Sequence, residues 1–226
     1  MPLDGLDACR VYFGLPLSGS RQPEGGLEPL LQEGDPVLNG HAPVAFGARD
    51  EFPAAFAEVR EHFGIAESVP LGVLGGSMGG AAAQLVAAEV PGVRAAVLIN
   101  PVVRLHDAID GIVAAMGATY AWSPASDQVA DRLDFVARAG ELAGVSLRYI
   151  TGADDLRDAI IAPVERIVAE LAERGATADH HVVPDMAHAL AEEPGIEAAP
   201  QTRHAAEVDR LAVEWFRRYL IATAAS

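Results

Sequence analysis

Short runs of apolar residues recur along the chain and predict β-strands. They occupy five ranges: residues 10–15, 71–74, 95–100, 146–151 and 178–183. The middle three runs are almost continuously apolar, which is typical of parallel strands covered by helices on both faces. We therefore expect a sheet of about five strands.

Segments with helical spacing alternate with these runs. Helices are expected over four ranges: residues 50–63, 81–89, 160–174 and 204–219. Strands that alternate with helices form βαβ units, and their crossovers are right-handed. The pattern predicts an α/β fold, specifically a three-layer α/β/α sandwich with a mostly parallel sheet.

Two stretches fit this alternation less well. Residues 21–49 are rich in glycine, proline and acidic side chains and are expected to form a long loop. Residues 104–141 are longer than a crossover requires. We interpret them as a helical cap over the carboxyl ends of the strands, with an ordinary pair of packing helices as the alternative. No linker divides the chain, so residues 1–226 are expected to form a single domain.

Composition and charge limit the partners of the protein. Half of the residues are apolar, and 32 acidic against 16 basic residues give a net charge of −16. Because no stretch concentrates positive charge, neither nucleic acid nor an anionic membrane is expected as a partner. The N-terminus lacks the pattern of a signal peptide, and no run approaches about 18 apolar residues. A cytoplasmic protein is predicted, and the single Cys9 excludes an intrachain disulfide.

One serine stands between two pairs of glycines where a strand gives way to a helix. Residues 75–79 read GGSMG, which fits the G-x-S-x-G spacing of a strained strand-to-helix turn. In such a turn the serine hydroxyl is exposed at the carboxyl end of the sheet. Ser77 is therefore a candidate nucleophile.

An acid and a histidine follow two later strands. The fourth strand is followed by Gly-Ala-Asp154-Asp155, and the fifth by a turn that contains His188. The carboxyl ends of parallel strands converge in one crevice, so these side chains are expected to meet Ser77. A serine hydroxyl needs a base within hydrogen-bond reach, and that base needs an orienting group.

These residues resemble those of the α/β-hydrolase superfamily over roughly residues 9–220. The GGSMGG elbow, the GADD turn, the MAH turn and the final helix carry the resemblance, and the chain order Ser, Asp, His agrees with it. The resemblance assigns the nucleophile to Ser77, the base to His188 and the acid to Asp155 in preference to Asp154. It implies acyl transfer to water through an acyl-serine intermediate.

The sequence indicates no cofactor and no metal. The remaining histidines lack metal-ligand spacing with a carboxylate or cysteine. The GGSMGG stretch has no acidic residue at a strand end about 20 residues further on, which a dinucleotide site would need. It also lacks the lysine of a phosphate-binding loop.

The predicted oxyanion hole departs from the family pattern. One donor is expected to be the backbone N–H of Met78, but the His-Gly that often marks the second donor is missing. The chain either lacks the first strands of the family or hides them in residues 21–49. We favour a reduced sheet in which the strand at residues 10–15 lies beside the elbow strand. Leu15 would then supply the second donor.

The predicted function is hydrolysis of a carboxylic ester with a small or medium apolar acyl group. Tyr120 and Trp122 are predicted to line the substrate pocket. A thioesterase, acyltransferase or peptidase would use the same three side chains, and a hydrolase-like binding protein without activity is a further alternative. A reduced sheet leaves an open edge, and a homodimer would cover it.

Overall fold

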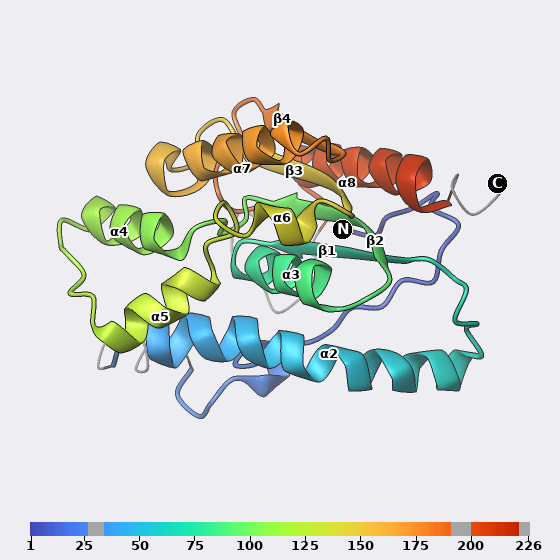
Figure 1. Ribbon diagram of the computed structural model, residues 1–226, viewed down its shortest axis with the longest axis horizontal. Helices are drawn as coiled ribbons and strands as arrows, with labels where there is room; N and C mark the ends of the chain where they lie inside the picture. The colour runs from blue at the N-terminus through green and yellow to red at the C-terminus, as the bar shows by residue number, and fades with distance from the viewer. Residues whose placement is uncertain (27–33, 191–199, 222–226) are drawn as a thin grey trace.

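Four parallel strands form the centre of the protein in a computed structural model, which describes residues 1–26, 34–190 and 200–221 (Figure 1). In sheet order they are β1 (Leu71–Gly76), β2 (Val93–Ile99), β3 (Ser146–Gly152) and β4 (Ala178–Val183). Each strand pairs in parallel with the next one along the chain. This regular order places the carboxyl ends of all four strands along one edge of the sheet.

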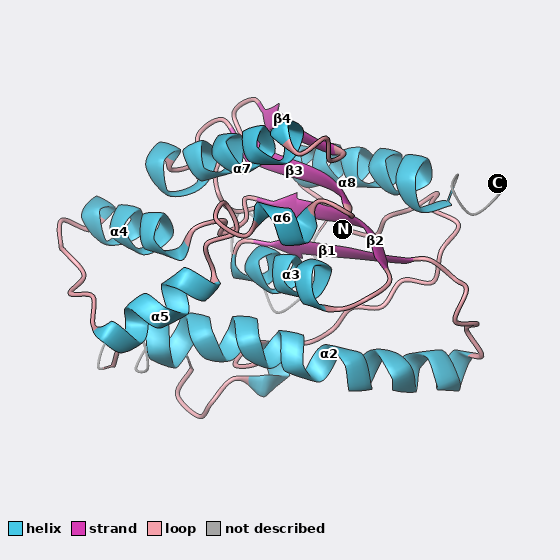
Figure 2. Cartoon of the chain, in the orientation of Figure 1, coloured by secondary structure: helices cyan, strands magenta, loops and turns pink. Residues whose placement is uncertain are grey.

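Helices cover both faces of the sheet, so the predicted three-layer architecture is confirmed (Figure 2). The α-helices are α2 (Ala42–Phe63), α3 (Met78–Glu89), α4 (Leu105–Ala115), α5 (Pro124–Arg132), α6 (Ala139–Leu142), α7 (Ala162–Glu173) and α8 (Arg203–Phe216). Short turns of 3-10 or π-helix are η1 (Gly19–Arg21), η2 (Val37–His41), η3 (Arg157–Ile161) and η4 (Arg217–Ile221). Within the described ranges, no helix has the length and apolar character needed to cross a membrane.

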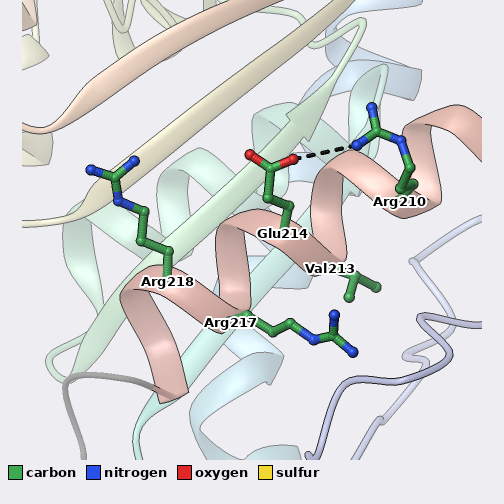
Figure 3. Close-up of a pocket in the computed structure, with 5 residues that line it drawn as sticks. All are labelled: Arg210, Val213, Glu214, Arg217 and Arg218. Atoms are coloured by element: carbon green, nitrogen blue, oxygen red, sulfur yellow. Dashed lines mark hydrogen bonds and ion pairs between the residues drawn. The ribbon is translucent and has the colours of Figure 1, made fainter.

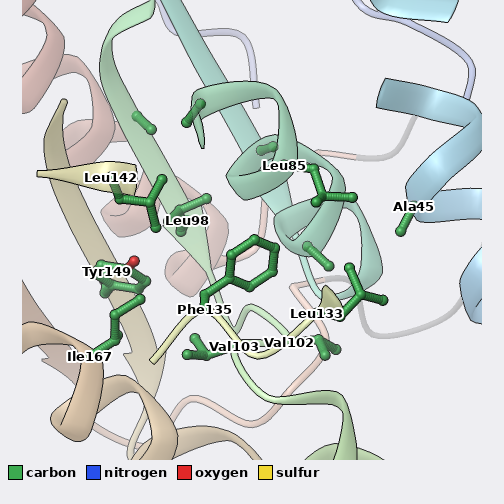
Figure 4. Packing of buried hydrophobic residues seen from close by; sticks show 14 of the residues in the cluster. Ala45, Leu85, Leu98, Val102, Val103, Leu133, Phe135, Leu142, Tyr149 and Ile167 are labelled. Atoms are coloured by element: carbon green, nitrogen blue, oxygen red, sulfur yellow. The ribbon is translucent and has the colours of Figure 1, made fainter. Parts of the chain in front are cut away.

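The larger core lies between the sheet and the helices α3 to α7 (Figure 4). Leu98 of β2 and Tyr149 of β3 point into it, and Leu85 of α3 and Ile167 of α7 meet them. Burial raises the pKa of the Tyr149 phenol, whose hydroxyl lies 3.4 Å from Gln84 Oε1. The helix α2 packs beside α3, past the β1 edge of the sheet (Figure 1).

The other face of the sheet is covered by α8 and by the first residues of the chain. Val97 and Ile150 on this face pack with Val208 and Trp215 of α8. Leu6 is buried in the same cluster, and the N–H of Leu3 donates to the buried Asp209 carboxylate at 2.9 Å. The N-terminal segment therefore completes the second core.

The strand predicted over residues 10–15 is wrong. This segment pairs with no strand, and it exposes Val11, Tyr12 and Phe13, whose exposed fractions are 39%, 70% and 41%. Its contacts are made by side chains instead: the Phe13 ring lies edge-on to Phe52 of α2 at 5.7 Å. The apolar run serves packing against a helix, and the described sheet has four strands.

The loop predicted over residues 21–49 is also wrong in its second half. Residues 37–41 form η2, and α2 begins at Ala42 with a proline in its first turn. Proline is tolerated there because the first N–H groups of a helix have no partner within the helix. The alternative that residues 21–49 hide a strand is therefore wrong for residues 37–49, which are helical, and residues 27–33 lie outside the described residues.

Residues 104–141 contain α4, α5 and α6. The helices α4 and α5 lie beyond the carboxyl ends of β1 and β2 (Figure 1). α4 packs closely on η3, because a Cβ on Gly111 would lie 2.6 Å from that of Ala159. Arg104, at the start of the segment, forms an ion pair with Asp134, between α5 and α6, at 2.9 Å. That the segment caps a substrate site stays a prediction.

Candidate active site

Ser77 occupies a sharp turn between β1 and α3. Its φ is +52° and its ψ is −120°, which is a rare conformation for a residue with a side chain. Its N–H donates to the carbonyl of Ile99 at 2.9 Å, which fixes the turn to β2. Gly75 is required sterically, because a Cβ at this position would lie 2.1 Å from the carbonyl oxygen of Gly79.

His188 lies in the turn after β4 and reaches both predicted partners. Its Nε2 is 2.9 Å from Ser77 Oγ, and its Nδ1 is 2.8 Å from Asp155 Oδ2. A carboxylate accepts hydrogen bonds, so Nδ1 carries the proton in this arrangement. Nε2 is then free to accept the proton of the serine hydroxyl.

Asp155 is the acid that meets the histidine, whereas Asp154 is exposed and makes no such contact. The Asp155 side chain is only 1% exposed, and the side chain of His188 is 43% exposed. The second carboxylate oxygen of Asp155, Oδ1, accepts from the N–H of Leu156 at 2.7 Å. The site is thus anchored by a buried carboxylate and opens to solvent at the imidazole.

Asn100 was not predicted as part of this site. It follows β2, is 1% exposed and has a φ of +41°. Its side chain hydrogen-bonds to the loops of both Asp155 and His188. In the sequence, Asn100 stands out only as a polar residue at the end of an apolar strand. This position does not reveal which loops its side chain contacts.

The sequence matches no family model and no curated protein. By structure, an acylaminoacyl peptidase from Pyrococcus horikoshii matches with a TM-score of 0.61 and 15% identity, over 76% of this chain and 28% of its own. TT1662 from Thermus thermophilus matches with a TM-score of 0.55 and 19% identity, over 80% and 66% of the two chains. Esterase PE8 matches with a TM-score of 0.51 and 16% identity, over 84% and 67%.

These neighbours share one architecture, with a parallel sheet between helices. The chain has the α/β-hydrolase fold. It spans only about a quarter of the length of the peptidases, 28% of the acylaminoacyl peptidase and 25% of a puromycin-hydrolyzing peptidase from Mycobacterium tuberculosis. The α/β-hydrolase fold is therefore established here by shape, and the chemistry must be argued from the site.

Met78 and Leu15, the two predicted oxyanion donors, each have a backbone N–H that donates to no partner among the hydrogen bonds described for this chain. Met78 is the first residue of α3, where helical N–H groups lack partners. Leu15 begins a tight turn closed by Ser18 N–H, with Leu17 at a φ of +60°. A Cβ on Gly79 would lie 3.4 Å from Leu15 Cδ1, so this turn borders the elbow.

Tyr120 and Trp122 lie together, with their ring centroids 4.7 Å apart. The Tyr120 hydroxyl donates to Asp35 Oδ1 at 2.6 Å, and the Trp122 indole N–H donates to Asp110 Oδ1 at 2.9 Å. The described contacts include no hydrogen bond between either ring and the three triad side chains. Tyr120 thus connects the 104–141 segment to Asp35, and Trp122 makes a hydrogen bond within the segment. That these two rings line the substrate pocket stays a prediction.

Two surface hollows of about 500 Å3 lie away from Ser77, Asp155 and His188. One is lined by Arg210, Val213, Glu214, Arg217 and Arg218 (Figure 3). It lies near the amino ends of the strands, because Trp215 of the same helix donates to the carbonyl of Ser146 at the start of β3. The other lies between α2 and β1. Within the part of the chain that the structure describes, no group of three or more His, Cys, Asp or Glu side chains is arranged to hold a metal ion.

Proposed function

We propose that the protein is a serine hydrolase that cleaves a carboxylic ester with a small or medium apolar acyl group. The supporting observation is the continuous chain of hydrogen bonds from Ser77 through His188 to Asp155, with lengths of 2.9 and 2.8 Å. These lengths lie within the reach that proton transfer requires. The bonds also run in the order that makes a serine hydroxyl nucleophilic.

In the proposed reaction, Ser77 Oγ attacks the carbonyl carbon while His188 Nε2 takes its proton. The N–H groups of Met78 and Leu15 would stabilise the oxyanion. The C–O bond to the alcohol then breaks, and His188 returns the proton to the leaving alkoxide. Water attacks the acyl-serine by the same steps, which releases the acid and restores Ser77. Asp155 keeps the imidazole in the required tautomer throughout.

A fluorophosphonate probe tests the nucleophile. The probe should label the protein at Ser77, as mapped by mass spectrometry of the peptides, and the Ser77→Ala variant should remain unlabelled. Label on another residue, or no label on the wild type, would contradict the proposal. A hydrolase-like binding protein would instead keep its ligand affinity in the Ser77→Ala variant without ever showing turnover.

A peptidase is the second candidate function. The observation that favours it is the likeness to peptidases of the α/β-hydrolase fold, among them an enzyme named for acylaminoacyl substrates. A panel of p-nitrophenyl esters, acyl-CoA thioesters and aminoacyl anilides separates the candidates. An ester should give the highest kcat/KM under the leading proposal. Faster cleavage of the anilides would favour the peptidase.

A further inference from the structure

The side chain of Asn100 lies between the loop that carries Asp155 and the loop that carries His188. Its Nδ2 donates to the carbonyl oxygen of His188 at 2.8 Å and to that of Ala187 at 3.3 Å. Its Oδ1 accepts from the N–H of Gly152 at 2.8 Å. One buried amide therefore joins the start of the acid loop to the main chain of the histidine.

We propose that Asn100 is a positioning residue for the triad. It holds the main chain of His188 against the acid loop, so that the imidazole reaches Ser77 and Asp155 at once. Asn100 touches no reacting atom and acts only through these two loops. This inference rests on the proposed hydrolase function.

The position suits asparagine better than its closest relatives. The amide offers donors toward two carbonyl groups and an acceptor toward one N–H group, which matches its three partners. Aspartate would turn an acceptor toward both carbonyls. The φ of +41° also favours asparagine among residues with a side chain. The backbone N–H donates to Ile150 at 2.8 Å, which fixes the residue to β3.

The competing explanation is that Asn100 stabilises the fold and nothing more. Thr151 provides a matched control, because it is fully buried, lies at the same level of the sheet and loses one hydrogen bond when its hydroxyl is removed. That bond joins Thr151 to His180, at 2.7 Å, and holds neither triad loop. A purely structural role predicts that Asn100 and Thr151 variants of equal stability have equal activity.

The kinetic test compares Asn100→Gly, Asn100→Asp and Thr151→Val on an ester that the wild type hydrolyses. Asn100→Gly keeps the left-handed backbone accessible and removes the side chain with its amide. It should lower kcat about 100-fold, because a displacement of about 1 Å has that effect, and KM should change less than about threefold. Thr151→Val should lower the thermal midpoint and leave kcat within about threefold. Equal kcat losses in folded Asn100→Gly and folded Thr151→Val would overturn the proposal.

The second test does not depend on turnover. The His188 Nδ1 proton in its hydrogen bond to Asp155 should give a low-field 1H NMR resonance in the wild type and in Thr151→Val. In Asn100→Asp, and in Asn100→Gly, the resonance should broaden or move upfield. An unchanged resonance in a folded Asn100 variant would overturn the proposal. A wild type that shows the resonance but no turnover would contradict the hydrolase function and leave the positioning role supported.

Discussion

The φ of +52° at Ser77 costs a residue with a side chain on the order of 1–3 kcal/mol. The surrounding backbone offsets this cost, because Ser77 N–H donates to Ile99 and Ser77 C=O accepts from the N–H groups of Gly80 and Val102. The strain holds the hydroxyl where His188 can reach it. The elbow is therefore an arrangement of backbone as much as of side chains.

Asp155→Asn should lower kcat about 10⁴-fold, because an amide at this position favours the wrong imidazole tautomer. The neighbouring Asp154→Asn is the matched control, since Asp154 is exposed and adjacent in sequence. We expect its kcat to stay within about threefold of the wild type. Steady-state kinetics on one ester decides the question. Similar losses in both variants would show that Asp155 does not act through His188.

Gly152→Ala should disrupt the histidine turn. A Cβ at this position would lie 2.0 Å from the carbonyl oxygen of Met186 and 2.9 Å from that of Ala187, so the turn that carries His188 must move. We expect kcat to fall by at least about 100-fold and the thermal midpoint to fall as well. Gly144→Ala is the control, because its added Cβ meets nothing within 4 Å. Full activity in Gly152→Ala would contradict the packing described here.

The sequence predicted that Ser77, Asp155 and His188 lie together because each follows a strand and the strands are parallel, and the structure places them within hydrogen-bond distance. The sequence could not predict the hydrogen bonds of Asn100 or the tight packing around Gly152. Both depend on how closely two loops from different strands approach, which no local pattern encodes. The choice of Asp155 over Asp154 came from a family resemblance, and the distances agree with it.

At the level of elements, strands were predicted well where side chains are buried on both faces, as in β2 and β3. The segment at residues 10–15 is also apolar, but it packs against α2 and joins no sheet. A short apolar run looks the same in the sequence whether it packs against a helix or pairs with a strand. The start of α2 was missed because its glycine and proline residues suggested a loop. Tertiary packing overrides such local preferences.

Acidification should lower the free energy of unfolding through His180 of β4. Burial lowers the pKa of His180 below its ordinary value of 6.5, although Glu165 and Asp179 act in the opposite direction. The folded state then binds a proton less readily than the unfolded state. The stabilising contribution is complete above pH 6.5 and is lost as the pH falls toward the folded pKa.

Urea unfolding at pH 7.5 and pH 5.5 measures this effect. His180→Gln should lose less stability between the two pH values than the wild type loses. Other groups titrate in the same interval, including the half-buried His41, whose pKa desolvation lowers, so the difference between the two proteins is the informative quantity. An identical loss in both proteins would exclude His180 as a source of the pH dependence.

At the scale of the whole molecule, two cores hold the sheet between its helical layers, and the first residues of the chain complete one of them. The layered architecture followed from the alternation of strands and helices in the sequence. The reduced sheet was also anticipated, although its strand number was not. Counting strands requires knowing which apolar runs find a partner, and that is a property of the complete fold.

The strand that precedes the proposed nucleophile is an outer strand of the described sheet, because β1 pairs with β2 alone. Outer strands open more readily than inner ones. Amide protons of β1 should therefore exchange with deuterium sooner than those of β2. Turnover should also be lost at a lower urea concentration than the helical circular dichroism signal. Local unfolding of β1 displaces Ser77 while the rest of the protein stays folded. Coincident losses of turnover and of circular dichroism would show that β1 unfolds together with the rest of the protein.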